Sequence, residues 1–348
     1  MQYRELGASG LTLSAIGLGT MTWGEQNSRK DAFQQLDCAL DYGINFVDTA
    51  EMYPVPPNAQ TQGLTEQYLG NWLTHSGRRQ DVVLATKVTG GDGNNSGFDY
   101  IRGGPRLNRK QIFQALDDSL RRLQTDYIDL YQVHWPERPA NIFGRSAPGD
   151  YSLTDYTPIN ETWQALNDLV KQGKVRHIGV SNETPWGLMQ YQAASVAGHG
   201  APIVSIQNPY NLLNRQFEVS LAEWSIYERI GLLAYSPLAF GMLSGKYLQD
   251  QRPADGRLTL FERFQRYNHP TAFQATERYV ALARQYDISP VHLALGFVHR
   301  QPFVASTIIG ATTLSQLQEN IDSLTTPMSE ALLADIDLIH RDISNPAP

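Results

Sequence analysis

The sequence predicts a closed (β/α)8 barrel, the TIM-barrel fold, with an added β-hairpin at the amino terminus and extra helices at the carboxyl terminus. Along the 348 residues, about eight apolar strand-like runs alternate with helix-like segments, and eight such units close this barrel. Several runs end in a polar residue that can carry a proton, and such barrels carry their active sites at the carboxyl ends of the strands. An open doubly wound sheet is the alternative, but so many regular alternations favour closure.

The first elements are expected to be a short hairpin and a barrel strand. Residues 1–14 contain a Gly-Ala-Ser-Gly turn at 7–10 between two short extended runs. Residues 16–20 (Ile-Gly-Leu-Gly-Thr) predict the first barrel strand. Its Gly17-x-Gly19 pattern lacks the third glycine of a dinucleotide fingerprint and is not followed closely by a helix, so it does not indicate a Rossmann site.

The remaining helices and strands alternate in order. The helix predicted over 108–123 is typical, because Asn108 is a favourable N-cap, Gln111 can complete a capping box, and apolar residues recur every four positions. The other predicted helices cover 29–42, 64–74, 160–172, 217–229 and 314–323, with further ones after Pro185, within 272–300 and from Ser329. The predicted strands cover 44–48, 82–87, 127–133, 175–180, 203–207, 231–235 and 304–309.

Three long loops, 54–63, 88–107 and 136–159, follow predicted strands on the expected active face, where loops carry function. Whether they close as a lid is left open by the sequence. No linker, repeat or low-complexity stretch divides the chain, so we expect one domain over residues 1–348.

The composition indicates a protein with an acidic surface. The formal net charge is -7 and the pI about 5.6, which does not favour nucleic-acid binding, because that relies on basic surface. No run approaches the ~20 apolar residues of a membrane span, and the first residues lack the apolar run of a signal peptide. We therefore expect a cytoplasmic protein with no membrane contact.

The single cysteine, Cys38, excludes an intramolecular disulfide and is expected to be an inert, partly buried thiol.

Four proton-active side chains stand at or near predicted strand ends. Asp48, Lys87 and His134 each end an apolar run, and Tyr53 follows Asp48 closely. An ammonium beside a phenol lowers the pKa of the phenol, and a carboxylate beside the ammonium keeps it charged, so Tyr53 is expected to donate a proton near neutral pH. The imidazole of His134 can orient a carbonyl oxygen by a hydrogen bond. Because no serine or cysteine nucleophile shares these ends, the set fits carbonyl reduction better than acyl transfer.

Each of the four residues also has a purely structural interpretation. Asp48 and Lys87 can form a structural ion pair, Tyr53 can pack on nearby prolines, and His134 can be a core histidine. Their shared location favours the joint catalytic interpretation. A metal-dependent hydrolase is the competing use of a barrel mouth. The eight histidines form neither His-x-His nor His-Glu-x-x-His, and only His134 ends a predicted strand, so no metal site is expected.

A reductase also needs a hydride source, and the later strand ends offer polar groups that can hold one. Asn182 carries both a donor and an acceptor for a carboxamide, and Tyr210 can stack on a flat ring. Residues 236–246 form a loop of small and hydroxylated residues with one lysine, which suits a pyrophosphate. Residues 310–313 lead into the helix 314–323, whose amino terminus favours anions. The alternative for that helix is an ordinary capped, solvated face.

With these residues in place, the sequence resembles the aldo-keto reductase superfamily over nearly its whole length. Several independent motifs in the family's order are much stronger evidence than any one of them. The matching segments are 17–21, 43–50 with Tyr53, the strand with Lys87, 123–131, 134–136, 173–182 and 236–238. The insert after Tyr53 and the run 207–210 are most similar to a bacterial Tas-like subgroup, which is related to the β subunits of voltage-gated potassium channels.

The resemblance implies an NADPH-dependent carbonyl reductase without a Rossmann domain. It implies Tyr53 as the general acid and Asp48 and Lys87 as the pair that tunes it. It also implies His134 as the residue that orients the carbonyl group. Family members that reduce carbon–carbon double bonds have a glutamate at that position, so the histidine favours aldehydes or ketones as substrates.

The resemblance further implies which residues hold NADPH or NADP+. Tyr210 is expected to stack on the nicotinamide. Arg257, in preference to Arg252, is expected to bind the 2′-phosphate, with Lys246 as the other possible cation. The full implied set is Gly19, Thr20, Met21, Asp48, Ser181, Asn182, Gln207, Tyr210, Tyr235, Ser236, Pro237, Leu238, Gly241, Ser244, Lys246, Arg257, Gly310, Thr312, Gln316, Glu319 and Asn320.

Two features leave the substrate and the class of function open. Residues 54–62 and the long loop 136–159 depart from the family pattern and reshape the pocket rim. The residues expected to contact a planar or apolar carbonyl compound are Trp23, Tyr53, His134 and Trp135. The alternative to a reductase is an NADP(H)-binding redox sensor or regulatory subunit with little turnover. The sequence predicts no oligomeric state.

Overall fold

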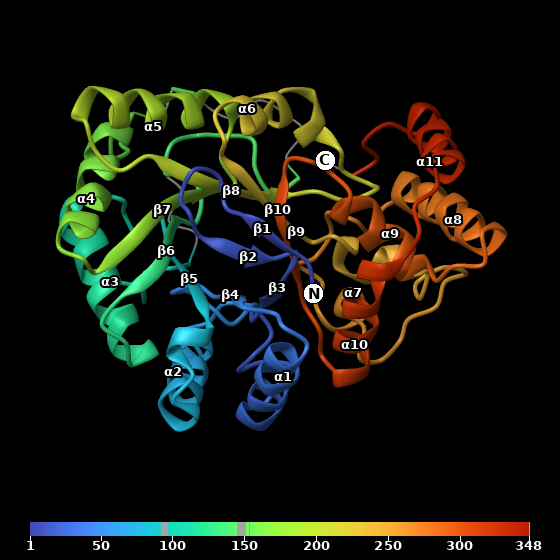
Figure 1. Cartoon of the computed structure of the whole chain (residues 1–348), viewed down its shortest axis with the longest axis horizontal. Coiled ribbons are helices and arrows are strands. Elements are labelled where there is room, and N and C mark those ends of the chain that lie inside the picture. The colour runs from blue at the N-terminus through green and yellow to red at the C-terminus, as the bar shows by residue number, and fades with distance from the viewer. Residues whose placement is uncertain (92–96, 145–150, 153, 348) are drawn as a thin grey trace.

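The computed structural model describes residues 1–91, 97–144, 151–152 and 154–347 of the chain, and Figure 1 shows its course from end to end. Eight parallel strands close into a barrel, and helices surround it. This confirms the predicted (β/α)8 barrel, together with the amino-terminal hairpin and the carboxyl-terminal helices.

The barrel strands are neighbours in the order β10-β3-β4-β5-β6-β7-β8-β9, and the pairs are parallel. Their bounds are β3 (Ile16–Gly19), β4 (Phe46–Asp48), β5 (Val83–Val88), β6 (Ile128–Val133), β7 (Val175–Ser181), β8 (Ile203–Pro209), β9 (Gly231–Tyr235) and β10 (Val304–Ile309). The register places Asp48 beside Ala85 and Lys87 beside Gln132. Polar residues near the carboxyl ends of neighbouring strands therefore meet at one end of the barrel.

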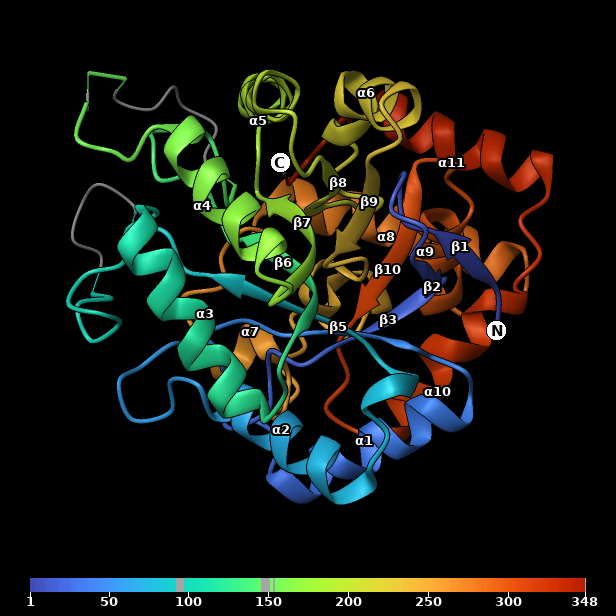
Figure 2. The same cartoon turned by 60° about the vertical axis from the view of Figure 1, so that its left-hand side comes forward.

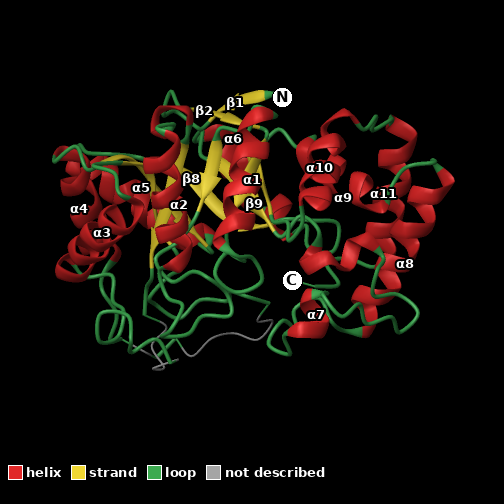
Figure 3. Cartoon of the chain, turned by 90° about the horizontal axis from the view of Figure 1, so that it is seen from below, coloured by secondary structure: helices red, strands yellow, loops and turns green. Residues whose placement is uncertain are grey.

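A hairpin of β1 (Tyr3–Glu5) and β2 (Thr12–Ser14) closes the other end. Leu6 follows β1, and Leu13 lies on β2. Both are fully buried in a small apolar cluster with barrel residues such as Phe46. Figure 3 shows the hairpin at one end of the strands and most of the long loops gathered at the opposite end. The loop end is thus the one available for a ligand.

The helices lie around the strands, most of them on the outside of the barrel, as Figure 2 shows. Their bounds are α1 (Arg29–Asp41), α2 (Leu64–Ser76), α3 (Arg109–Leu123), α4 (Ile159–Lys171), α5 (Pro185–Gly198), α6 (Leu221–Tyr227), α7 (Arg257–Leu260), α8 (Pro270–Gln285), α9 (Pro290–His299), α10 (Leu314–Asp322) and α11 (Glu330–Asp342). Within the described ranges, no helix has the length and apolar character needed to cross a lipid bilayer.

The start of α3 shows how local sequence sets these elements. The side chain of Asn108 accepts a hydrogen bond from the N–H of Gln111 at 3.0 Å, as predicted for an N-cap. The predicted capping box is wrong, because the amide of Gln111 instead bonds the carbonyl of Gly104 and the N–H of Arg106. Gln111 thereby fixes the end of the loop that leads from β5 into α3.

Short helical turns are where the structure differs most from the predicted elements. The helix predicted over 217–229 is divided into η2 (Gln216–Val219) and α6, because Ser220 leaves helical geometry at φ -142°. The loop after β9 contains an unpredicted turn, η3 (Ala239–Ser244). Phe240 and Gly241 have φ values of 58° and 90° there, so no helical periodicity could reveal it.

Candidate active site

A buried polar group lies at the carboxyl ends of β4, β5, β6 and β8. We call it the floor, and it consists of Asp48, Lys87, Gln132 and Gln207. Lys87 Nζ lies 2.6 Å from Asp48 Oδ2. The other carboxylate oxygen, Oδ1, accepts hydrogen bonds from the side-chain amides of Gln132 (3.1 Å) and Gln207 (2.9 Å). Buried charges are stable when they are paired and hydrogen-bonded, and the floor meets both conditions.

Tyr53 and His134 lie together over the floor. Their ring centres are 5.6 Å apart in an edge-on arrangement, and Lys87 Nζ is 5.1 Å from the centre of the Tyr53 ring. The loop after β4 positions Tyr53 through its backbone, whose N–H bonds Ala50 and whose carbonyl accepts from Gly63. The backbone of His134 continues the β6 ladder. Two proton-active groups thus meet at one point of the barrel mouth.

The pKa of Tyr53 moves opposite to the sequence-based expectation. Burial raises it well above the ordinary value, and the Asp48 carboxylate raises it further. The expected lowering by the Lys87 ammonium is therefore corrected, because Nζ directs its hydrogen bonds to Asp48 and to the carbonyl of Thr49 (2.9 Å). The phenol consequently stays protonated through neutral pH, which is the state a proton donor needs.

The pKa values of His134 and Lys87 are both lowered. Burial is the main cause for His134, with the Lys87 charge as the second, and the pKa falls well below that of a free histidine. The imidazole is therefore neutral, with one N–H to donate. Burial also lowers the pKa of Lys87, while Asp48 opposes the shift by stabilising the ammonium.

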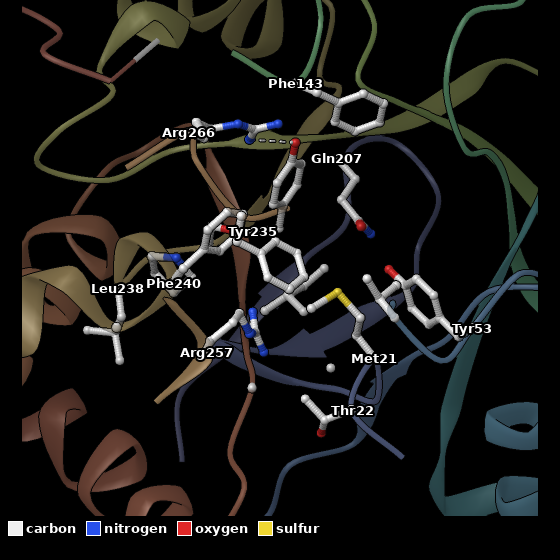
Figure 4. A pocket seen from close by; sticks show the side chains of 18 of the residues that line it. Met21, Thr22, Tyr53, Phe143, Gln207, Tyr235, Leu238, Phe240, Arg257 and Arg266 are labelled. Atoms are coloured by element: carbon white, nitrogen blue, oxygen red, sulfur yellow. Dashed lines mark hydrogen bonds between the residues drawn. The ribbon is translucent and has the colours of Figure 1, made fainter. Parts of the chain in front are cut away.

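A cavity of about 1240 Å³ opens over the floor, which exceeds the roughly 300–1,000 Å³ typical of small-molecule sites. Figure 4 shows side chains from several strand ends and loops converging on it. Most of the predicted site residues line it. They are Gly19, Thr20, Met21, Asp48, Tyr53, His134, Trp135, Ser181, Asn182, Gln207, Tyr235, Ser236, Pro237, Leu238, Gly241, Ser244, Lys246, Arg257, Gly310, Thr312, Gln316, Glu319 and Asn320.

Three predicted site residues do not line the cavity. Lys87 is buried in the floor, and the other two are Tyr210 and Trp23. Tyr210 is fully buried, donates its hydroxyl hydrogen bond to Glu218 and packs against Phe297 at 5.8 Å between ring centres, so the prediction that it stacks on a nicotinamide is corrected. Trp23 is fully buried too, with its indole N–H bonded to Gln35 at 3.0 Å. It therefore does not contact a substrate. Both are core residues whose neighbours the sequence did not reveal.

Tyr235, at the end of β9, offers the aromatic face that Tyr210 does not. Figure 4 shows its ring in the cavity. Its hydroxyl donates to Asn182 Oδ1 at 2.6 Å, while the Asn182 amide donates to the carbonyl of His134 at 2.9 Å and to Ser181 Oγ at 3.1 Å. These groups place amide and hydroxyl donors and acceptors beside the floor.

The lining of the cavity also has groups suited to phosphates. Lys246 and Arg257 line it, whereas Arg252 is exposed and lies outside the lining. At Gly310, a side chain would meet nothing within 4 Å, so the backbone faces open space. At the start of α10, Thr313 accepts from the N–H of Gln316 at 3.2 Å, which is the capped form that the alternative interpretation predicts.

A dinucleotide fits this donor set. Amide groups lie near the floor, an aromatic ring lies beside them, and two cations and an open glycine also line the cavity. The large cavity is continuous across them. Among the described residues, no group of three or more histidine, cysteine or acidic side chains could hold a metal ion.

Sequence reasoning missed several lining residues. Phe143 and Arg266 come from the loops after β6 and α7 and, together with Arg257, form what we call the rim of the cavity. Gln132 of the floor was missed as well. The sequence signal for the rim was a group of arginines at 257, 263 and 266. Side chains in a long loop follow no regular period, so the sequence does not show which of them point into the cavity.

Comparisons with known proteins agree with this site. The profile of the Aldo/keto reductase family matches residues 15–341. The chain is 53% identical to "Protein tas" of Escherichia coli (strain K12) over the full length of both chains. It is 35% identical to "Uncharacterized oxidoreductase YrpG" of Bacillus subtilis (strain 168), with 96% of this chain and 94% of the relative covered.

A more distant relative has a different description. The chain is 32% identical to a "Probable voltage-gated potassium channel subunit beta" of Arabidopsis thaliana, with 93% of this chain and 91% of the relative covered. These similarities confirm the predicted relationship to the Tas-like proteins and to the channel subunits. The chain belongs to the aldo/keto reductase family of oxidoreductases.

Proposed function

We propose that the protein reduces aldehydes or ketones to alcohols with NADPH. The observation that carries the proposal is the meeting of a protonated phenol and a neutral imidazole over the buried floor. Tyr53 and His134 both line the cavity, and the burial that shifts their pKa values keeps each in the state the reaction needs. Carbonyl reduction requires one proton donor at the developing alkoxide and one group that orients the oxygen.

NADPH is the proposed cofactor because the cavity is lined by polar groups suited to each of its parts. Ser181, Asn182 and Gln207 can hold the carboxamide, and Tyr235 offers an aromatic face. Residues 236–246 with Arg257 can hold the phosphates. The adenosine end is assigned to Gly310, Thr312, Gln316, Glu319 and Asn320. When bound, the nicotinamide supplies the hydride that reduces the carbonyl carbon.

The residues of the chain then have distinct roles. Tyr53 gives its proton to the carbonyl oxygen, and the imidazole N–H of His134 holds that oxygen by a hydrogen bond. Nδ1 of His134 is buried and without a hydrogen-bond partner among the described residues, so the ring is not already committed to a structural network there. Asp48 pairs with Lys87 and keeps it charged in the floor, where Nζ lies 5.1 Å from the centre of the Tyr53 ring.

The substrate side of the cavity is apolar and aromatic. Trp135, Phe98, Phe143 and Ile142 line it, and Trp135 lies 5.8 Å from Phe98 between ring centres. This supports a planar or apolar carbonyl compound as substrate. Trp23, which the sequence suggested for this role, is replaced by these residues.

A regulatory subunit with little turnover is the second candidate, because of the similarity to a protein described as a channel subunit. Both candidates need the same cofactor site. Mixing the protein with NADPH, following cofactor absorbance with a panel of aldehydes and ketones, and quantifying the alcohol distinguishes them. We expect one alcohol formed for each NADPH oxidised. Tight NADPH binding without turnover of any carbonyl compound would instead support the regulatory candidate.

A further inference from the structure

Arg266 is a cation at the rim that the proposed reaction does not use. It lies in the segment between α7 and α8, is partly buried, and lines the cavity. Its guanidinium donates a hydrogen bond from Nη1 to the Tyr235 hydroxyl at 3.3 Å, which Figure 4 shows as a dashed line, and it also bonds the Tyr267 hydroxyl. A guanidinium has five N–H donors, so most of its capacity is left for a ligand or for water.

The guanidinium is surrounded by aromatic rings rather than by carboxylates. Its Cζ atom lies 5.6 Å from the centre of Phe143, 6.0 Å from Phe240 and 6.0 Å from Tyr267. Among the described residues, no carboxylate pairs with it, and its electrostatic neighbours are the tyrosines 235 and 267. Aromatic faces hold a cation in place without neutralising it. The positive charge of Arg266 is therefore preorganised and unbalanced.

This charge lies at the end of a row of rings that begins at the proton donor. Ring centres are 5.6 Å apart from Tyr53 to His134, 4.7 Å from His134 to Trp135 and 6.0 Å from Trp135 to Phe143. Arg266 follows next, over Phe143. A flat molecule with its carbonyl at Tyr53 can therefore lie along this row and place its far end near Arg266.

Four other arginine and lysine side chains line the cavity, and the contacts of three of them differ from those of Arg266. Arg138 is paired with Glu183 at 2.5 Å. The charge of Lys246 is stabilised by Asp255, and Arg257 lies over Phe240 and Phe264. Lys246 and Arg257 are both assigned to the cofactor phosphates. Arg266 alone of these contacts Phe143, which belongs to the loop that carries the aromatic substrate side.

We propose that the preferred substrates are aromatic carbonyl compounds that carry a carboxylate, and that Arg266 binds this carboxylate. The proposal rests on the proposed reductase function and specifies its substrate class. Arginine suits the task, because its planar fork matches the two oxygens of a carboxylate. The row of rings orients the planar body, and the guanidinium fixes its distance from Tyr53.

The test compares two substrates of nearly equal size with saturating NADPH: 4-carboxybenzaldehyde and its neutral amide, 4-carbamoylbenzaldehyde. We expect the wild-type protein to have a kcat/KM at least tenfold higher for the acid. In Arg266→Gln the acid-to-amide ratio of kcat/KM should fall about 10- to 100-fold, mainly through KM, since charged hydrogen bonds have that strength. Arg266→Lys should restore part of the ratio, and the exposed control Arg252→Gln should leave it within twofold.

Three results would overturn the proposal, and they are distinguishable. Equal kcat/KM for acid and amide in the wild-type protein refutes the substrate class while leaving the reductase function in place. If Arg266→Gln weakens NADPH binding and slows both aldehydes alike, Arg266 serves the cofactor. If no carbonyl compound is turned over, the reductase function fails and the substrate class fails with it.

Discussion

The floor and the rim of the cavity differ in how their charges are balanced. In the floor, Asp48 and Lys87 neutralise each other and two glutamine amides complete their hydrogen bonds. In the rim, Arg257 and Arg266 lie over aromatic rings with no carboxylate partner among the described residues. The floor comes from strands, whereas the rim comes from two loops and the first residue of α7. A balanced floor suits a fixed chemical step, and an unbalanced rim suits the binding of anions.

The largest expected effect is at Tyr53, the proposed proton donor over the floor. Tyr53→Phe removes the phenol hydroxyl but keeps the ring that packs beside His134, so the fold and NADPH binding should be retained. We expect kcat to fall about 10²- to 10⁴-fold, the usual contribution of a general acid. Steady-state kinetics and a fluorescence titration with NADPH measure the two quantities. Unchanged kcat would show that another group donates the proton.

The next effect concerns the balance of the floor itself. Lys87→Met leaves the buried Asp48 carboxylate without its ammonium, and breaking a buried pair in this way costs about 3–5 kcal/mol. Urea denaturation measures the loss of unfolding free energy. The double variant Lys87→Met with Asp48→Asn should recover much of it, because no unpaired charge remains. If the single variant is as stable as the wild type, the floor is not the balanced pair described above.

At the rim, a cation can be removed with a smaller effect. Arg257→Ala should weaken NADPH binding about 10- to 100-fold and NADH binding much less, because only NADPH has a 2′-phosphate for a charged hydrogen bond. Equilibrium titration with both cofactors measures this, and Arg252→Ala is the matched control from the exposed part of the same segment. If the preference for NADPH over NADH is unchanged, the 2′-phosphate is instead assigned to Lys246.

The smallest expected effect is a pH dependence of stability caused by His134. Its pKa is lowered in the folded protein by burial and by Lys87, so below the ordinary value of about 6.5 the unfolded chain binds a proton that the folded protein does not. Stability is therefore highest above pH 6.5 and falls below it, by up to about 1.4 kcal/mol per pH unit for this group.

Unfolding free energies of wild type and His134→Gln, measured between pH 7 and 5, isolate that dependence. The variant should lose less stability over this range. Changing the exposed His75 to Gln is the control and should follow the wild type. Parallel curves for wild type and His134→Gln would show that His134 titrates alike in the folded and unfolded protein.

The sequence predicted the floor better than the rim for a physical reason. Asp48 and Lys87 stand near the ends of apolar runs, and parallel strands bring such ends together regardless of loop details. Tyr210 and Tyr235 both follow that pattern, yet Tyr210 turns into the core against Phe297 while Tyr235 faces the cavity. The direction of one side chain after a strand depends on packing that no periodicity encodes.

The rim could not be predicted in the same way. Arg266 and Phe143 meet from loops that are far apart in the chain, and only the folded structure brings them together. The direction of the Tyr53 pKa shift was also missed, because it depends on how completely the phenol is buried and on where Lys87 directs its hydrogen bonds. Both are consequences of tertiary packing.

One measurement tests the central claim, that a carbonyl is reduced over the floor by a hydride from the cofactor. The protein is incubated in ordinary water with a turned-over aldehyde and NADPH carrying deuterium at the transferable C4 position, and the alcohol is analysed by mass spectrometry and proton NMR. The account predicts one deuterium on the carbinol carbon of each alcohol molecule. An alcohol with hydrogen from water at that carbon, or NADPH oxidation without alcohol, would contradict it.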